Sequence, residues 1–180
     1  MKSKLRATLA MVVLGTVLAG PGVAYSQPVG PSGSGPGESH TLQPARIETV
    51  IEIDMHEFSF ANPAGDINPV FRIPAGRTVG IHLHNEGALL HEVAFGRILD
   101  ADGEYAEVLT EAVPSDLFFY WGASRVEVGG ATFAEIEAPA GLRDIWMRIN
   151  VPAEFAGEWE LGCFIPDHYE GGMHATLIVE

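Results

Sequence analysis

The segment from Cys163 to Met173 constrains the fold of this chain most strongly. It holds the only cysteine, with His168 five positions later and Met173 five positions after that. A thiolate, an imidazole and a thioether are soft and borderline donors, which copper accepts in both of its oxidation states. Three donors on one loop leave such a site incomplete. The fold must therefore bring a further donor to this loop from a distant part of the chain.

His91 is the expected fourth donor. It lies 72 positions before Cys163, in the segment 85–95 that directly follows an alternating segment. Taken alone, a cysteine is often a small buried apolar residue and a methionine often fills gaps in a core. The spacing Cys-x4-His-x4-Met is more specific than either residue, because it is followed at once by the segment 175–180, which is typical of a strand. The set of four therefore predicts a metal site.

These four residues, His91, Cys163, His168 and Met173, resemble the type 1 (blue) copper site of the cupredoxins, the family of plastocyanin, azurin and rusticyanin. The resemblance implies one copper ion cycling between Cu(II) and Cu(I), with a weak axial methionine. It implies an electron carrier with no open coordination position, and therefore not an enzyme. The alternative is a periplasmic copper-tolerance protein that sequesters or delivers copper.

Two neighbours of these donors depart from the familiar pattern. Glu92 follows His91 at a position where cupredoxins often have Asn or Ser. We expect its carboxylate to hydrogen-bond between the two loops of the site, and the alternative is that it approaches the metal. Asp167 precedes His168, and its charge would stabilise a protonated histidine and so couple copper release to acid. The resemblance also implies that electrons leave through the His168 edge, within an apolar rim of Ile165, Pro166 and Tyr169.

Short alternating segments separated by Gly and Pro turns predict an all-β, Greek-key β-sandwich. Residues 78–84 are the clearest case, since Val79, Ile81 and Leu83 share one face. The other expected strands are residues 47–60 as one long edge strand, 69–74, 90–95, 143–151, 157–163 and 175–180.

A mid-chain insertion is expected at 97–142, because the minimal family pattern lacks such a segment. Residues 104–112 and a segment from Pro114 are compatible with short helices, the second with Ser115 or Asp116 as its cap. The aromatic run 118–121 is expected to pack on the sandwich rather than to bind a partner.

The N-terminal residues 1–26 are typical of a secretory signal, with a basic start, an apolar run and small residues before Gln27. A retained N-terminal anchor is the alternative. Residues 27–45 have the composition of a flexible Gly/Pro/Ser linker. The predicted cupredoxin domain is thus 46–180, in a periplasmic or secreted protein. A lone cysteine in an oxidising compartment is a liability unless it is buried or bound to metal, which also favours Cys163 as a ligand.

The net charge is strongly negative, at −14 for the whole chain. Without residues 1–26, which hold both lysines and one arginine, seven arginines face 24 acids and the net charge is about −17. Such a surface repels nucleic acid and anionic membranes and attracts a basic partner. We therefore expect a basic redox protein as partner, no nucleic acid, no membrane insertion of the mature chain, and a monomer. The alternative is that the acids serve solubility alone.

The remaining histidines carry weaker signals. His82 and His84 form one His-x-His pair, which looks like the pairs of multicopper oxidases, but those enzymes need several pairs across at least two domains. We expect both to be ordinary residues of an exposed strand face, and extra metal there is the alternative. His174 should point away from the copper, because neighbours on a strand alternate faces. The sequence indicates no role for His56.

Overall fold

The structure is a computed structural model, and it describes residue 44 and residues 46–180. The predicted signal (1–26) and nearly all of the predicted linker (27–45) lie outside the described residues. Within the described residues, no helix has the length and apolar character needed to cross a membrane.

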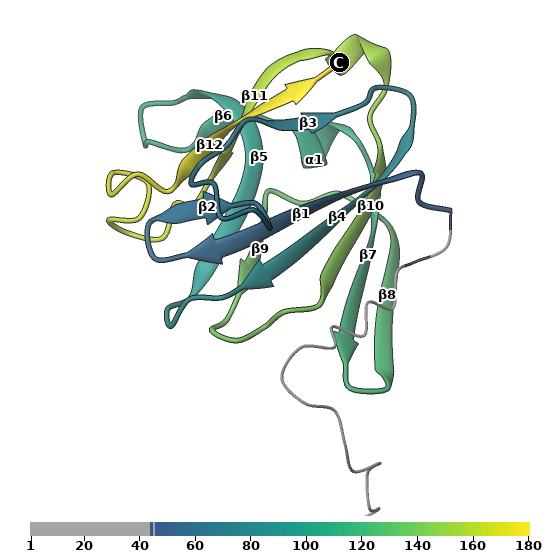
Figure 1. Cartoon of the computed structure of the whole chain (residues 1–180). Coiled ribbons are helices and arrows are strands. Elements are labelled where there is room, and N and C mark those ends of the chain that lie inside the picture. Colours follow the sequence, from purple (N-terminus) through teal and green to yellow (C-terminus); the bar gives the residue numbers. More distant parts are fainter. Residues whose placement is uncertain (1–43, 45) are drawn as a thin grey trace, which may run out of the picture. The chain divides into compact units, whose positions relative to one another are not determined.

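The described domain is a sandwich of two β-sheets (Figure 1). The first sheet contains, in spatial order, β2 (Ser59–Ala61), β1 (Thr49–His56), β4 (Thr78–Asn85), β10 (Ile145–Asn150), β7 (Ser115–Trp121) and β8 (Ser124–Ala131). The second contains, in spatial order, β3 (Phe71–Ile73), β12 (His174–Val179), β11 (Gly157–Gly162), β5 (His91–Leu99) and β6 (Tyr105–Val108), with β9 (Glu135–Ala138) also paired to β5. Two short helices, α1 (Leu109–Ala112) and a 3-10 turn (Ala153–Phe155), complete the elements. The predicted all-β sandwich is confirmed.

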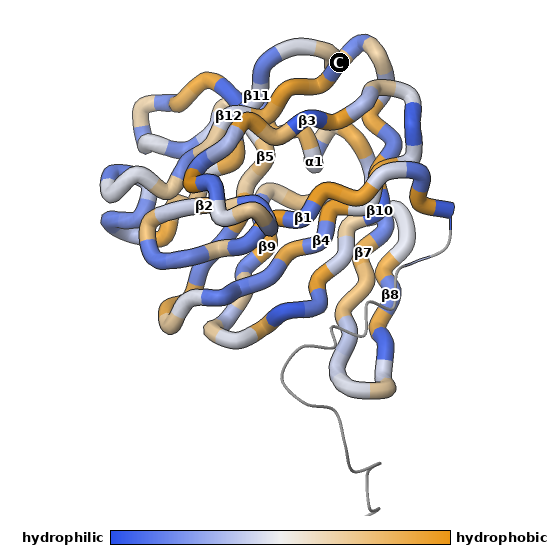
Figure 2. The backbone as a smooth tube through the Cα atoms, in the orientation of Figure 1, coloured by the Kyte–Doolittle hydropathy of each residue, from blue (hydrophilic) through white to orange (hydrophobic). Residues whose placement is uncertain are grey.

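Alternation along the strands separates the inner faces of the sheets from the outer faces. In β4, Val79, Ile81 and Leu83 lie in the core between the sheets, as predicted. Burying one such aliphatic side chain contributes about 1.5–3 kcal/mol. Figure 2 shows hydrophobic residues along β1, β10 and β12. The inner face of β10 and that of β11 were also predicted correctly, with Met147, Trp159 and Leu161 all buried.

The prediction of one long edge strand at 47–60 is wrong. The chain turns at Glu57 and Phe58 and forms the antiparallel pair β1–β2, while β1 also pairs in parallel with β4. Phe58 adopts a φ of 61°, in the left-handed region, which an uninterrupted strand does not contain. The turn places Phe58 on the surface next to His168, so this error hid a neighbour of the predicted site.

The prediction of a short helix from Pro114 is also wrong. Residues 115–121 form β7, which pairs with β10 and with β8. The cause is packing against β10: Phe118 and Tyr120 alternate with Phe119 and pack with Trp146 in a second small apolar cluster. The aromatic run therefore packs on the sandwich as predicted, except for Trp121, which is exposed. In the segment 104–112 only the last four residues are helical, because the first part pairs with β5 as β6.

Most of the segment 97–142 is paired with the two sheets. It supplies β7 to the first sheet and β6 and β9 to the second, so its strands hydrogen-bond to strands predicted for the sandwich itself. The β7–β8 hairpin extends at the edge of its sheet (Figure 1). β9 matters most for the site, because it pairs with the first four residues of β5, including His91.

Candidate metal centre

The predicted donors from both halves of the chain lie together. The ring Nδ1 atoms of His91 and His168 are 3.3 Å apart, and Cys163 Sγ lies 3.4 Å from His168 Nδ1. These three donor atoms all lie within 4.8 Å of one another. His91 and Cys163 are fully buried, and His168 is 5% exposed. The fold therefore provides a thiol and two imidazoles around one point.

Met173 is fully buried, and its backbone joins the other two donors of its loop. Its N–H donates to the carbonyl of His168 at 3.0 Å, and its carbonyl accepts from the N–H of Cys163 at 3.1 Å. These two bonds close the loop between β11 and β12 into a compact unit. The position of Met173 is thus fixed next to the donors, while its role as an axial ligand stays a prediction.

Asn85 fixes the loop that leads into His91. Its side-chain amide donates to the carbonyls of Leu89 and Ala138, and its side-chain oxygen accepts from the N–H of Gly87. Gly87 itself lies so close to the imidazole that an added Cβ would be 2.8 Å from His91 Nε2. In the segment 85–95, Asn85 is therefore a bracing side chain, and His91 is the donor that it positions.

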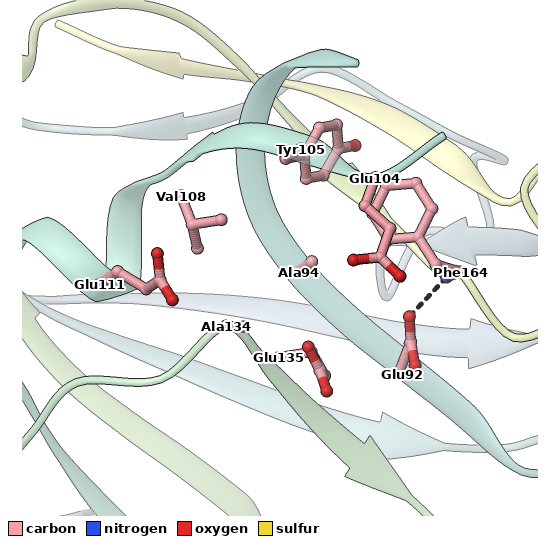
Figure 3. A pocket seen from close by; sticks show the side chains of 9 residues that line it. All are labelled: Glu92, Ala94, Glu104, Tyr105, Val108, Glu111, Ala134, Glu135 and Phe164. Carbon is pink, nitrogen blue, oxygen red and sulfur yellow. Dashed lines mark hydrogen bonds between the residues drawn. The ribbon is translucent and has the colours of Figure 1, made fainter. Parts of the chain in front are cut away.

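Glu92 connects the two halves of the site, as the favoured interpretation of the sequence predicted. Its carboxylate accepts a hydrogen bond of 2.6 Å from the N–H of Phe164, and its own N–H donates to Cys163 Sγ at 3.4 Å. The first of these bonds is drawn in Figure 3. Both bonds span loops that are about 70 residues apart in sequence, so Glu92 holds the cysteine loop against β5.

Four carboxylates line a pocket beside β5 (Figure 3). They belong to Glu92, Glu104, Glu111 and Glu135. Burial raises the pKa of Glu92, and the charges of Glu135, Glu137 and Glu104 raise it further, whereas the Phe164 N–H opposes this rise. The acidic character read from the composition thus extends to the immediate neighbourhood of the candidate centre.

The electrostatics of Cys163 and His91 suit a bound cation. Burial raises the pKa of the Cys163 thiol, because a thiolate in an apolar site loses its hydration. Burial, and then the proximity of His168, lower the pKa of His91 and favour a neutral imidazole with a free lone pair. A metal ion offsets the cost of the buried thiolate and uses that lone pair. The residues present therefore fit a metal with a preference for sulfur and nitrogen.

The rim around His168 contains one residue that the sequence interpretation missed. The rings of Phe58 and His168 meet edge to face, with centroids 5.1 Å apart, and Phe58 is 41% exposed. An added Cβ on Gly171 would lie 2.7 Å from the Phe58 ring, so a glycine is needed where the ligand loop passes the β1–β2 turn. No sequence signal marked Phe58, because it was assigned to a strand interior.

The other predicted neighbours have clear positions. Ile165 and Tyr169 are half-buried and Pro166 is exposed, so part of the expected apolar rim reaches the surface. His174 points away from the donors, with its ring stacked on Tyr169 and its Nδ1 atom 3.4 Å from Glu160. His56 is half-buried at the end of β1.

Comparisons with known proteins agree with this architecture. No family model matches the chain. A multicopper oxidase of Cercospora beticola is 24% identical over 144 residues, which cover 77% of this chain and 21% of that protein. A multicopper oxidase structure from Campylobacter jejuni superposes with a TM-score of 0.54 at 13% identity, over 77% of this chain and 31% of that chain. The chain has a cupredoxin fold. The resemblance inferred from the four donors is thereby confirmed at the level of the fold.

Rusticyanin from Thiobacillus ferrooxidans is a further structural neighbour, with 17% identity and a TM-score of 0.43 over 73% of this chain and 77% of that chain. The chain spans about a fifth of the length of the curated oxidase and about a third of the Campylobacter structure.

Proposed function

We propose that this cupredoxin binds one copper ion through His91, Cys163, His168 and Met173, and that it carries single electrons between redox partners. The observation that supports this most directly is the convergence of the Cys163 thiol and two histidine Nδ1 atoms within 4.8 Å of one another in a buried site. When bound, copper supplies a one-electron change between Cu(II) and Cu(I).

The protein supplies a frame that resists rearrangement. Glu92 joins the two loops, Asn85 braces the loop before His91, and backbone hydrogen bonds close the ligand loop at Met173. The two copper oxidation states prefer different geometries, so a frame that holds one compromise geometry keeps the reorganisation between them small. With four protein donors and nearly complete burial, the site offers no position for a substrate. We therefore propose a carrier rather than an enzyme.

The decisive experiment is a visible spectrum of the copper-loaded protein beside its Cys163→Ser variant. Copper–thiolate charge transfer gives the wild type an intense absorption, and the serine variant loses it completely while keeping its far-UV circular dichroism. A matched control is His56→Ala, which removes a histidine outside the donor set and keeps the colour. An unchanged visible spectrum in the serine variant would show that Cys163 is not the ligand.

We propose an exported protein with a basic redox partner. The net charge of about −17 for the chain without residues 1–26 supports long-range attraction, and the partly exposed rim of Phe58, Ile165 and Pro166 beside His168 supports a small apolar contact. Charge steering is screened beyond about 8 Å at physiological salt, whereas apolar contact is not. Electron-transfer rates should therefore fall with salt to a plateau, and Ile165→Asp should lower that plateau with little change in the spectrum. A rate that does not vary with salt would mean that the acids serve solubility alone.

One observation favours the alternative function, a copper-tolerance protein that stores or delivers copper. A second group of metal-binding side chains lies outside the proposed centre, at Glu52, His82 and His84. Stoichiometry distinguishes the two functions. One tightly held copper per chain that is reversibly reducible supports the carrier, even where a weaker ion binds elsewhere. Additional weaker copper without such reversible reduction supports tolerance.

A further inference from the structure

The sequence predicted that His82 and His84 lie on an ordinary exposed strand face. This prediction is wrong. His82 is fully buried, and the His84 side chain is only 16% exposed. They lie on β4, where Glu52 of β1 is the direct cross-strand partner of His82. The neighbour on the other side is Trp146 of β10, whose ring stacks on the His82 ring at 3.9 Å with an angle of 16°. The pair is therefore held in place by two flanking strands.

Three donor atoms of this group form a small triangle. Glu52 Oε2 lies 2.9 Å from His82 Nδ1 and 3.1 Å from His84 Nε2, and the two nitrogens are 2.9 Å apart. Hydrogen bonds alone cannot satisfy all three edges. If both nitrogens carry protons toward Glu52, the N–N edge brings two hydrogens together. If one nitrogen donates, the other directs its lone pair at the Glu52 oxygen. In either case one edge of the triangle is repulsive.

A cation at the centre would turn all three edges into favourable contacts. Three ligands in cis positions of an octahedral ion, with bonds of about 2.1 Å, lie about 3.0 Å from one another. The corresponding tetrahedral spacing is about 3.4 Å. The observed edges of 2.9–3.1 Å match the octahedral case. Two histidines and one carboxylate on one face of an ion are a known arrangement for divalent transition metals, which leaves the other positions open.

The surroundings of the triangle favour the same interpretation. His82 Nε2, the nitrogen on the far side of the ring, lies 3.4 Å from Asp144 Oδ1 and has no hydrogen bond within the described part of the chain. The negative charge of a carboxylate behind a histidine favours a proton on the nearer ring nitrogen, which leaves the opposite nitrogen free to bind metal. Asp54 adds a further nearby negative charge, acting on His84. The hydrogen bonds to His82 and His84 lower the pKa of Glu52 to about 2, so this carboxylate is charged at neutral pH.

We propose that Glu52, His82 and His84 form a second metal site, separate from the cysteine centre, that binds a divalent transition-metal ion such as Zn(II) or Cu(II). Asp144 is a positioning residue for His82. The site belongs to the face of the first sheet, and its donors come from β1 and β4 alone. The Glu52 side chain is 31% exposed, so ions and water reach the open positions. Among the common divalent ions Cu(II) should bind tightest, as is general for nitrogen and oxygen ligands.

The test is a calorimetric titration of Zn(II) into the full chain carrying Cys163→Ser, which removes the thiolate of the other centre. The double change Glu52→Gln with His84→Ala should lower the number of bound Zn(II) ions by one per chain. Glu52→Gln alone should lower the affinity for that Zn(II) ion by more than tenfold, and Asp144→Asn should lower it by about 10- to 100-fold. His56→Ala is the control, because it removes a histidine from β1 outside the triangle and should leave the stoichiometry unchanged.

Three outcomes separate the possibilities. Loss of one Zn(II) in the double variant, with an unchanged circular dichroism spectrum, supports the site. The proposal is overturned if the Cys163→Ser parent and the variant that also carries Glu52→Gln and His84→Ala bind the same number of Zn(II) ions per chain. It is also overturned if the parent shows no Zn(II) binding that depends on these residues. In those cases the triangle holds only a proton. Because the parent already lacks Cys163, failure of the proposed copper centre would leave this result unaffected.

Discussion

The two histidine clusters of this protein are built in different ways. The cysteine centre joins loops at the ends of strands, and its histidines come from positions 77 residues apart. The Glu52 cluster uses the register of two neighbouring strands, with two donors only two residues apart. The first is sealed, and the second is partly open to solvent. A buried centre suits electron transfer, whereas an open one suits uptake and release of an ion.

The largest expected difference between the clusters is in how they lose metal. Dialysis against EDTA should remove an ion held by Glu52, His82 and His84 while the colour of the cysteine centre persists. The physical reason is that the chelator reaches open coordination positions directly, whereas the buried donors must first separate. Metal analysis and the visible spectrum, recorded on the same samples, measure both. Simultaneous loss of both ions would show that the two centres do not differ in access.

Glu92 allows the rigidity of the sealed centre to be measured. Glu92→Ala leaves the Phe164 N–H without its partner and should lower the free energy of unfolding by about 1–3 kcal/mol. Glu92→Gln keeps an acceptor at the same place and should cost less. Denaturant unfolding of the metal-free variants measures the effect. Equal destabilisation by Gln and Ala would mean that the charge of the carboxylate, and not its acceptor oxygen, joins the two loops.

The open cluster should make stability depend on pH. The Glu52 pKa falls from 4.5 to about 2, so its contribution is present above pH 4.5 and is lost as the pH falls toward 2. Burial lowers the His84 pKa, but the hydrogen bond and charge of Glu52 outweigh this and raise it above 6.5. The His84 contribution is therefore present below pH 6.5 and is lost as the pH rises through the raised pKa.

Metal-free protein should thus gain stability from this cluster between about pH 4.5 and 6.5. The upper limit from the Glu52 shift is about 3 kcal/mol, and solvent screening of this half-buried side chain reduces it toward about 1 kcal/mol. Denaturant unfolding in EDTA at about pH 3, 5.5 and 9 should show a profile that flattens in Glu52→Gln. A profile that is the same in both proteins would locate the pH dependence in other groups.

Met173 should have the smallest effect on stability and a specific effect on redox behaviour. Met173→Leu is close to volume-conserving and should cost less than about 1.5 kcal/mol. If the thioether is a weak axial donor, its loss removes more donation from Cu(II) than from Cu(I), so the reduction potential should rise while copper stays bound. Voltammetry measures this shift. An unchanged potential would identify Met173 as a core residue only.

The sequence by itself determined the fold class and the donor residues that meet in the cysteine centre. Alternation in the segments that form β4, β10 and β11 fixes which side chains face the core, because a strand sends successive residues to opposite faces. The spacing of Cys163, His168 and Met173 places three predicted donors on one short loop for any fold that ends in a strand at 174–179. Glu92 was also predictable, since a carboxylate beside a buried donor needs a hydrogen-bond partner.

Only the tertiary structure decided the environments of Phe58, residues 115–121 and His82. Phe58 meets His168 because a turn, set by one left-handed residue, brings sequence-distant loops together. Residues 115–121 form a strand because pairing with β10 and packing in the aromatic cluster stabilise the extended conformation more than the local helix signals stabilise a helix. His82 is buried because Trp146 covers it from the neighbouring strand. Each depends on pairing and contact between strands distant in sequence, which local periodicity does not contain.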